Sequence, residues 1–320
     1  MARDPIKINQ HIWGDYLSAQ GKKLPDLADV EDVTNRVIRI MGGNPGAMQL
    51  QGTNTYLLGI GKSRILVDTG QGMLLWAENM IKLLKDRDLD ISHILLTHWH
   101  GDHTGGVPDL VAYNPEFASR VYKSHPDPGQ QSIEDGQYFR TEGATVKAVF
   151  TPGHAIDHMC FLLEEENALF TGDNVLGHGY SVAEDLGLYM KSLVYMEGQH
   201  CAVGYPAHGM KIENLPRKIK LYIQHKKGRE KQIYGALVGN KAKVVKAGQS
   251  GKGSLTTREL VYSLHGDVPD DMFELALEPF MTEVLWKLAE DHKVGFEMAG
   301  GNRRWFLNER TWRAESIKQC

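Results

Sequence analysis

The sequence predicts an α/β layered domain followed by a smaller helical domain. Up to about residue 210, short apolar runs typical of strands alternate with amphipathic helix patterns, and this alternation favours an α/β architecture. The length of 320 residues allows one large domain and a smaller one. We therefore expect a leader over residues 1–35, a main domain over 36–212 whose last helix continues to about residue 240, and a C-terminal domain over 213–320.

The first elements follow from local patterns. Residues 1–35 are polar and acidic with weak helical periodicity, which fits either a free tail or a helix that covers the site or a partner subunit. Strands are predicted at Val37–Ile40, Thr53–Leu58 and Arg64–Asp68, the last followed by a Thr-Gly turn. Apolar residues at helical spacing over Met73–Leu89 predict the first covering helix.

Later elements continue the same layered order. Met159–Leu163 and Ala168–Phe170 are predicted strands, and the acidic turn Glu164–Asn167 between them is interpreted as a solvated hairpin. From Val182 to Leu193 the apolar spacing predicts an amphipathic helix.

The run Thr97–Gly106 is the most informative stretch of the chain. It follows the apolar segment Ile94–Leu96, and a strand ending in a glycine-punctuated turn would bring its side chains into one small space. Imidazole and carboxylate together suit a divalent transition metal, zinc above all. A solvated His-rich loop is the alternative, but the spacing, the preceding strand and the following glycines oppose it. The predicted ligands in this run are His98, His100, Asp102 and His103.

Three further apolar runs end in a candidate ligand. They are Val149–His154, Ala168–Asp173 and Ala202–Gly209, which supply His154, Asp173 and His208. A capping Asp or a hydrogen-bonded His would explain any one of them. Because sheet enzymes carry their chemistry on loops at strand ends, the set together predicts one shared metal site.

With this constellation in view, the chain closely resembles the metallo-β-lactamase superfamily of hydrolases from about Val37 to Gly209. The resemblance implies a four-layer αββα sandwich with a binuclear metal centre at one edge. It also implies that His98, His100 and His154 bind the first metal. The second metal would be bound by Asp102, His103 and His208, and Asp173 would bridge the two ions.

The chemistry of such a centre follows from general principles. A metal ion lowers the pKa of bound water from about 16 to about 7, and two ions stabilise both the nucleophile and the developing oxyanion. Asp102 adjoins that dimetal-bound hydroxide and is the natural proton acceptor and donor. A Ser or Cys nucleophile is not required, and Cys160, Cys201 and Cys320 are interpreted as structural or exposed thiols. Zinc is the expected metal, with manganese or iron as alternatives.

Composition is that of a soluble enzyme. The net charge of −4 makes no case for nucleic-acid or membrane binding. Three cysteines form no disulfide framework, the N-terminus lacks the form of a secretory signal, and no apolar run approaches the roughly 18 residues of a membrane span. We therefore expect a cytoplasmic protein.

The segment after Asp173 is the candidate substrate contact. It is glycine-rich and adjoins the predicted metals, so its backbone can approach a substrate closely. Asn174, Gly179 and Tyr180 are the candidate residues there. His158 is a further candidate that would orient substrate or a metal ligand, with a hydrogen-bonded loop histidine as the alternative.

The composition changes beyond Gly209. The segment Arg217–Lys252 contains eleven Lys or Arg residues and only one acidic residue, Glu230. A solvated helix face explains most such runs, but this one would also suit an acidic partner, whether RNA, a phosphopantetheine arm or a carrier protein.

The C-terminal domain is predicted as helix, helix and β-ribbon. A capping box at Thr256 and Glu259 begins one helix, and a second helix covers about Phe280–Leu288. Strands at Val294–Met298 and Arg304–Leu307, separated by Gly300-Gly301, form a wing. This order resembles the winged-helix appendage of the lactamase-β-like-2 branch of the superfamily. The second helix is acidic, whereas a groove-reading helix should be basic. We therefore expect a packing element, a lid or a homodimer contact rather than a DNA reader.

Within that branch, the chain resembles stand-alone thioesterases of fungal aromatic polyketide pathways. The motifs that carry this resemblance are Thr53–Leu57, Thr97–Gly106, Thr151–His154 with Asp157–Met159, and Phe170–Gly179. The resemblance implies release of a polyketide acid from the acyl carrier protein of a non-reducing synthase, as in the atrochrysone carboxyl-ACP thioesterases. A single-strand endoribonuclease of the lactamase-β-like-2 type is the alternative, and only that alternative involves nucleic acid. Glyoxalase-II-like hydrolysis of a glutathione thioester is a third. A non-catalytic binding module is disfavoured because every expected ligand is present.

Overall fold

The computed structural model describes residues 24–46 and 48–308. The chain divides into two compact units between Tyr222 and Ile223. The first unit contains two β-sheets with helices, and the second contains helices and a β-hairpin.

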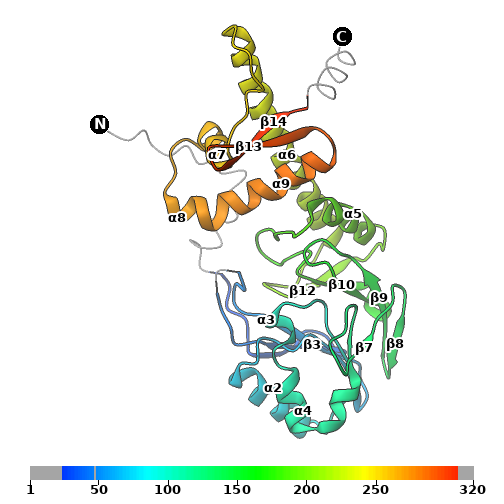
Figure 1. Ribbon diagram of the computed structural model, residues 1–320. Helices are drawn as coiled ribbons and strands as arrows, with labels where there is room; N and C mark the ends of the chain where they lie inside the picture. Colours follow the sequence, from blue (N-terminus) through cyan, green and yellow to red (C-terminus); the bar gives the residue numbers. More distant parts are fainter. Residues whose placement is uncertain (1–23, 47, 309–320) are drawn as a thin grey trace. The chain divides into compact units, whose positions relative to one another are not determined.

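The first sheet has seven strands in sequence order (Figure 1). The strands from β1 to β4 pair antiparallel, whereas the strands from β4 to β7 pair parallel. The parallel half places the loops that follow β4 and β5 side by side at one edge. The strands are β1 (Val30–Asp32), β2 (Val37–Met41), β3 (Asn54–Leu58), β4 (Ser63–Val67), β5 (Asp90–Leu95), β6 (Val121–Lys123) and β7 (Gln131–Ser132).

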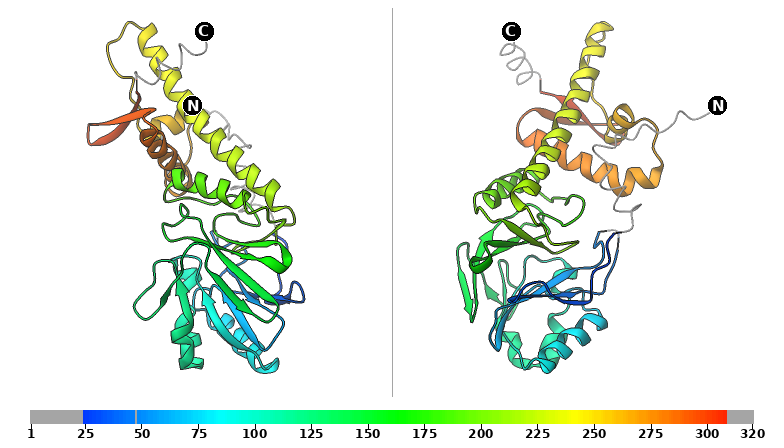
Figure 2. Two further views of the ribbon diagram at one scale, coloured as in Figure 1. Left: turned by 90° about the vertical axis from the view of Figure 1, so that its right-hand side faces the viewer. Right: turned by 180° about the vertical axis from the view of Figure 1, so that it is seen from behind.

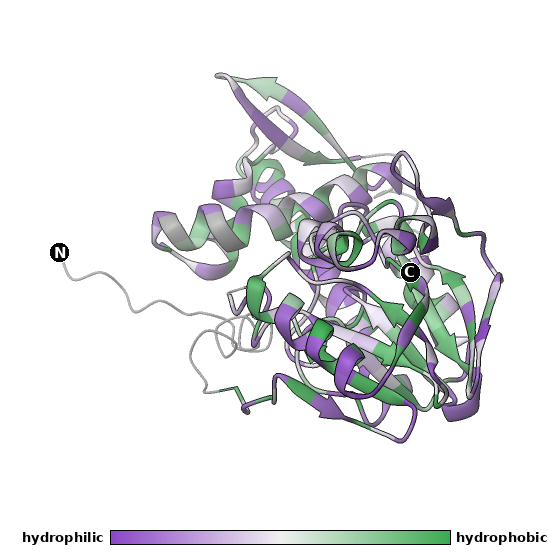
Figure 3. Cartoon of the chain, turned by 90° about the horizontal axis from the view of Figure 1, so that it is seen from below, coloured by the Kyte–Doolittle hydropathy of each residue, from purple (hydrophilic) through white to green (hydrophobic). Residues whose placement is uncertain are grey.

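The second sheet has five strands in the order β12-β11-β10-β9-β8. Neighbours pair antiparallel except β11 and β12, which are parallel. The central strands β10 and β11 are rich in hydrophobic residues and almost wholly buried, as expected for strands covered on both faces. Figure 3 colours the whole chain by hydropathy. Their bounds are β8 (Tyr138–Thr141), β9 (Ala144–Phe150), β10 (Met159–Leu163), β11 (Ala168–Gly172) and β12 (Val203–Pro206).

Two hydrophobic clusters hold the layers together. Along β3, Tyr56 and Leu58 face the cluster shared with the second sheet, whereas Leu57 between them faces the cluster under the helices. This alternation follows from the period of two in a strand, which sends successive side chains to opposite faces. The first sheet is therefore buried on both sides.

Helices cover the outer faces of both sheets (Figures 1 and 2). On the first sheet, α2 (Leu74–Asp86) and α4 (Val107–Tyr113) bury Trp76, Met80 and Leu110. On the second, α5 (Leu186–Glu197) contacts the loop after β9, where Ser192 donates a hydrogen bond to the Pro152 carbonyl oxygen at 2.6 Å. The predicted four-layer αββα sandwich is confirmed.

The leader expected over residues 1–35 needs correction in its described part. Val30–Asp32 forms β1 and pairs with Ile38–Ile40 of β2, so the first sheet begins before residue 36. The strand was not predicted because its sequence is polar. Two of its three residues are exposed at the edge of the sheet, so the sequence shows no alternation of apolar and polar residues. Residues 1–23 lie outside the described residues.

The second unit follows the predicted order of helix, helix and β-hairpin. Thr256 and Glu259 form the capping box expected at the start of α7 (Thr257–His265). After α8 (Asp270–Met272), α9 (Glu278–Glu290) matches the second predicted helix. The hairpin of β13 (Val294–Ala299) and β14 (Asn302–Leu307) turns at Gly300 and Gly301, both with positive φ. The long helix α6 covers Leu215–Lys246.

Part of the basic segment is structural. The Lys226 amine lies 2.8 Å from a carboxylate oxygen of Glu283, and both side chains are buried. Burial lowers the pKa of Lys226, and the charge of Glu283 opposes that shift. An acid of the second predicted helix therefore pairs with a basic residue of α6 within this unit.

Candidate metal centre

The loop that follows β5 carries four of the predicted ligands. His98 and His100 precede the short helix α3 (Gly101–Thr104), and Asp102 and His103 lie on it. The glycines after it permit close packing: a Cβ at Gly106 would lie 2.1 Å from the carbonyl oxygen of Thr69 and 2.4 Å from the Trp76 ring. Because no side chain fits there, glycine is required for the loop to return against α2.

The other three predicted ligands follow strands of the second sheet. His154 follows β9, Asp173 follows β11 directly, and His208 follows β12. All three are buried. The strand-end placement expected from the sequence thus brings ligands from four strands to one edge of the sandwich.

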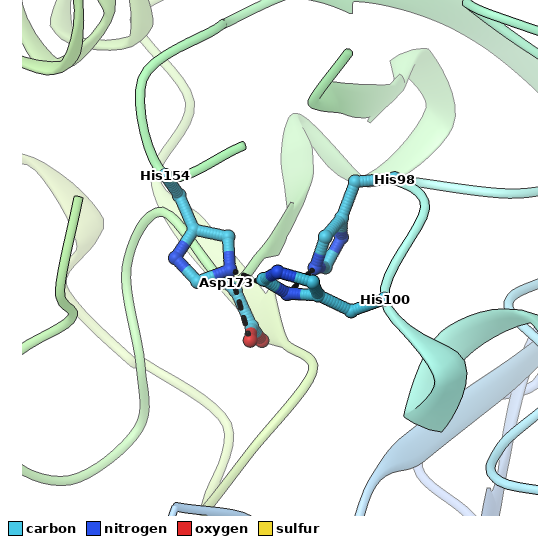
Figure 4. A group of neighbouring side chains, drawn as sticks. All are labelled: His98, His100, His154 and Asp173. Carbon is cyan, nitrogen blue, oxygen red and sulfur yellow. Dashed lines mark hydrogen bonds and ion pairs between the residues drawn. The ribbon is translucent and has the colours of Figure 1, made fainter. Parts of the chain in front are cut away.

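His98, His100, His154 and Asp173 form a first group. One nitrogen or oxygen atom of each lies within 4.8 Å of the others. Nδ1 of His100 is 2.8 Å from Nε2 of His98 and 3.2 Å from Nε2 of His154. Figure 4 shows the three imidazoles gathered around the Asp173 carboxylate.

Asp102, His103 and His208 form a second group with the same 4.8 Å spread. Oδ2 of Asp102 lies 3.4 Å from Nε2 of His208 and 3.6 Å from Nε2 of His103.

Asp173 contacts members of both groups. Its Oδ2 lies 3.5 Å from Nε2 of His154 in the first group and 3.5 Å from Nε2 of His103 in the second. Its Oδ1 lies 3.2 Å from Nε2 of His208. This is the position that a carboxylate shared by two metal ions requires.

Two buried imidazoles of the first group, His98 and His154, are neutral at pH 7. Burial holds the pKa of His98 well below its usual range. Burial also lowers the pKa of His154 to about 4. Their lone pairs are therefore available at neutral pH, as metal binding requires.

The carboxylates are ionised. Burial alone would raise the pKa of Asp102, but its hydrogen bond to His208 and the charge of His103 lower it to about 2. Burial also opposes ionisation of Asp173, yet the charges of His208 and His103 keep its pKa well below the usual range. Two ionised carboxylates in a buried site demand positive charge close by.

The carboxylates also affect the histidines of the second group. Burial alone would lower the pKa of His208, but the charge of Asp173 and hydrogen bonds to Asp102 and Asp173 raise it to about 9. Among the described residues, none forms a hydrogen bond with the buried Nε2 of His103. The centre thus combines buried nitrogen and oxygen atoms that can act as metal ligands with a high local negative charge, and such a site suits divalent cations.

Most of the histidines are held through their other nitrogen. Nδ1 of His98 lies 2.9 Å from the Thr97 hydroxyl, and Nδ1 of His154 lies 2.9 Å from the carbonyl oxygen of Val182. Nδ1 of His103 lies 2.8 Å from Oδ2 of Asp68. Such partners fix the tautomer and aim Nε2 at the centre.

The sequence did not reveal Asp68 as a site residue, because it predicted Asp68 only as the last residue of a strand before a turn. Its φ of +59° lies in the left-handed region that Asp tolerates better than most residues. An Asp directly before Thr-Gly at the end of a strand was the available signal.

Two of the four proposed substrate contacts have side chains that are enclosed by protein. His158 is fully buried. Its Nε2 accepts a hydrogen bond from the Asp173 backbone N–H at 3.1 Å, and its Nδ1 lies 3.1 Å from the Thr151 hydroxyl. Asn174 is also fully buried and donates to the Thr151 carbonyl oxygen at 2.8 Å. Neither side chain has exposed surface in this structure. The contact of His158 with the Asp173 backbone fits the second of its two predicted roles, which was to orient a metal ligand.

Gly179 and Tyr180 are partly exposed. The Gly179 carbonyl accepts a hydrogen bond from the Tyr222 hydroxyl at 2.9 Å, and the Tyr180 ring lies 4.8 Å from the Tyr222 ring. Their role in substrate binding stays a proposal.

The described cysteines are not poised as nucleophiles. Burial raises the pKa of Cys160 to about 12 and the pKa of Cys201 to about 11. Both thiols are buried and free, so they stay protonated at neutral pH. Cys320 lies outside the described residues.

Residues 49–208 match the family model of the metallo-beta-lactamase superfamily. The chain belongs to this superfamily. The resemblance seen in the sequence is therefore confirmed. Among the described residues, no helix is both long and apolar enough to cross a membrane.

Relatives from fungi match over nearly the whole chain. The lactamase-like protein adaB of Aspergillus niger is 63% identical over 302 residues, which cover 94% of this chain and 95% of the relative. The lactamase-like protein aptB of Emericella nidulans is 58% identical, covering 95% and 98%. A protein of Aspergillus chevalieri named atrochrysone carboxyl ACP thioesterase is 54% identical, covering 92% and 94%.

Solved structures share the fold. A beta-lactamase domain protein of Burkholderia ambifaria superimposes with a TM-score of 0.69 at 18% identity, covering 95% of this chain and all of its own. A metallo-beta-lactamase family protein of Thermus thermophilus gives a TM-score of 0.63 at 22% identity, covering 86% of this chain and 99% of its own.

Proposed function

We propose that this chain is a metal-dependent thioesterase that releases an aromatic polyketide acid from the acyl carrier protein of a non-reducing synthase. The observation that carries the hydrolase assignment is the pair of ligand groups joined through Asp173. The substrate is supported by the 54% identical relative whose name is atrochrysone carboxyl ACP thioesterase.

The proposed ligands divide as the geometry does. His98, His100 and His154 would bind one divalent ion, and Asp173 would reach both. When bound, two zinc ions, or manganese or iron in their place, would supply a water acidified for attack at neutral pH and positive charge for the oxyanion. The ligands of the second ion would be Asp102, His103 and His208.

Asp102 is the residue that we propose moves the proton. Its side chain is 14% exposed, against 0% for His103 and 2% for His208, so a substrate at the rim can reach it. Its carboxylate is ionised at neutral pH and can accept the proton that water loses as it attacks the thioester carbonyl. The new C–O bond replaces the C–S bond, and the proton passes to the leaving thiolate. The products are the free acid and the carrier-bound thiol.

The buried thiols support this route. A covalent acyl-enzyme on cysteine would need a thiolate, and Cys160 and Cys201 are protonated and buried. The free state of both thiols also fits the cytosol, which we propose as the location.

Exposed cations on α6 support an acidic partner such as a phosphopantetheinylated carrier protein. Several basic residues of the segment are already paired: Lys226 with Glu283, Lys220 with Glu197, and Lys252 with Glu297. Others are exposed and form no ion pair with any described residue, and they would steer an acidic protein by long-range attraction. These are Arg217, Lys227, Lys231, Lys243 and Lys246.

The experiment offers three substrates to the zinc-loaded full-length chain: an aromatic polyketide thioester on its carrier protein, an acyl-glutathione thioester and single-stranded RNA. Mass spectrometry measures the released acid, and gel electrophoresis measures RNA cleavage. We expect the carrier-bound thioester to be hydrolysed and the RNA to stay intact. His98→Ala should abolish hydrolysis, whereas His125→Ala, which removes an exposed histidine, should not.

Two results would contradict the proposal. Metal-dependent cleavage of RNA without turnover of either thioester would establish the endoribonuclease. Turnover of acyl-glutathione alone would establish the glyoxalase-II-like activity.

A further inference from the structure

Thr53 lies directly beside the second ligand group. It precedes β3 in the motif Thr53-Asn54-Thr55-Tyr56-Leu57, and its side chain is fully buried. Its hydroxyl oxygen lies 3.3 Å from Oδ2 of Asp102.

The surrounding hydrogen bonds show that the Thr53 hydroxyl has a proton to donate to Asp102. Oδ1 of Asn44 accepts from the Thr53 backbone N–H at 2.9 Å, so the Asn44 amide nitrogen is the atom that faces the Thr53 hydroxyl, at 3.0 Å. That nitrogen also donates to Oε1 of Gln71 at 3.0 Å. The Thr53 oxygen thus accepts from Asn44, and its single proton is free for Asp102.

The same segment contacts a second member of the group. The Gly52 carbonyl oxygen lies 3.4 Å from Nδ1 of His208, and Thr53 pairs with His208 as an isolated β-bridge. The Asn54 backbone N–H donates to the carbonyl oxygen of Ala207. The segment therefore holds the His208 loop and the Asp102 side chain together.

We propose that Thr53 is a positioning residue for the site of the second metal ion. The Thr53 hydroxyl holds the Asp102 carboxylate toward His103 and His208. The inference rests on the metal centre proposed above. Asn44 assists by directing the hydroxyl proton away from itself.

The contacts of one Asp102 oxygen explain how Thr53 would keep this carboxylate in the second ligand group. Oδ2 of Asp102 accepts from Thr53 and is also the oxygen near Nε2 of both His208 and His103. Rotation of the carboxylate would remove that oxygen from the group. Because Asp102 is partly exposed, water competes for it unless the buried hydroxyl holds it. The hydrogen bonds of Thr53 do not reach the first group.

The test measures metal binding by the full-length chain, with no substrate present. Metal-free protein is titrated with zinc against a chromophoric chelator, which resolves the two binding steps. In Thr53→Val, which keeps the shape and removes the hydroxyl, the second ion should bind roughly 10–100-fold more weakly, the usual effect of losing a partner of a metal ligand. The first ion should bind as in the wild type. Thr53→Ser should restore the second affinity to within a few-fold.

Thr55→Val is the matched control. Thr55 lies two residues further along the chain, on β3, and is equally buried. Its hydroxyl donates to the Ile40 carbonyl oxygen and accepts from the Trp76 indole N–H, so it contacts no proposed metal ligand. This variant should lose stability but keep both affinities. If Thr53→Val does not fold, Thr53→Ala in its place must show the selective loss.

Unchanged binding of the second ion to folded Thr53→Val would overturn the inference, as would an equal loss in Thr55→Val. Failure of the thioesterase assay leaves this test intact, because its readout is metal affinity. A wild-type chain that binds no zinc would overturn both the centre and the role of Thr53.

Discussion

Oδ2 of Asp68 lies 2.8 Å from Nδ1 of His103, and both side chains are buried. The other oxygen of Asp68 accepts from the Thr97 backbone N–H at 2.8 Å, which keeps the carboxylate from turning. His103 therefore donates through Nδ1 and presents Nε2 to Asp102 and Asp173. One carboxylate at the end of β4 thus links the loop after β5 to the second ligand group.

Asp68→Asn should weaken binding of the second ion and lower activity by roughly 10–100-fold, because an amide no longer stabilises the required tautomer. Metal content after dialysis and kcat/KM measure the two effects. Asp88→Asn is the control, since Asp88 also has a positive φ but is exposed on the surface. Equal behaviour of the two variants would refute a positioning role for Asp68.

Asp102→Asn should lower kcat by about a hundred- to ten-thousand-fold, the usual contribution of general acid–base catalysis. The amide keeps the size of the side chain but cannot accept the proton. Steady-state hydrolysis of the carrier-bound thioester at saturating zinc measures the loss, with Asp109→Asn on the neighbouring helix α4 as control. Activity within a few-fold of wild type, with both metals bound, would assign the proton transfer to another group.

Metal removal should destabilise the protein as well as inactivate it. A ligand that binds only the folded state at a thousand times its Kd contributes about 4 kcal/mol, so calorimetry should show a higher Tm with zinc than with a chelator. Elemental analysis should find close to two ions per chain. The double variant His98→Ala/His100→Ala removes two ligands of the first ion, so its zinc-dependent rise in Tm should be smaller than that of the wild type. Clearly fewer than one ion in reconstituted wild type would exclude the binuclear centre.

Charge reversal on α6 should separate the partner from the chemistry. Lys227→Glu/Lys231→Glu should raise KM for the carrier-bound thioester and reduce its dependence on salt, because exposed charges act through screened long-range attraction. Hydrolysis of a small acyl thioester should not change. Lys82→Glu on α2 makes the same kind of charge change elsewhere and should affect neither substrate. Equal KM values for all three proteins would remove α6 from carrier recognition.

Patterns that depend on neighbouring residues could be predicted from the sequence. The capping box at Thr256, the glycine turn at Gly300 and Gly301, and the apolar run before His98 each report a local constraint on the backbone. The strand-end ligands were predictable for the same reason, since each one comes shortly after the end of a strand. Local signals of this kind survive without knowledge of the partner strand.

Residues whose role depends on distant partners were missed or misplaced. Asp68 and His103 are 35 positions apart, and Thr53 and Asp102 are 49 apart. No sequence pattern near Thr53 predicts a contact with a metal ligand. His158 and Asn174 adjoin the ligands in sequence, and only their burial shows that they bond to protein rather than to substrate.

The sequence by itself determined which residue types stand at the ends of which strands, and so the chemistry that the site can perform. The tertiary structure alone decided how the two sheets pack, and therefore which oxygen of Asp173 faces which histidine and which nitrogen each imidazole presents. The physical reason is range. Backbone propensities and turn chemistry act over a few residues, whereas the orientation of a buried side chain depends on hydrogen bonds from strands that only the fold brings together.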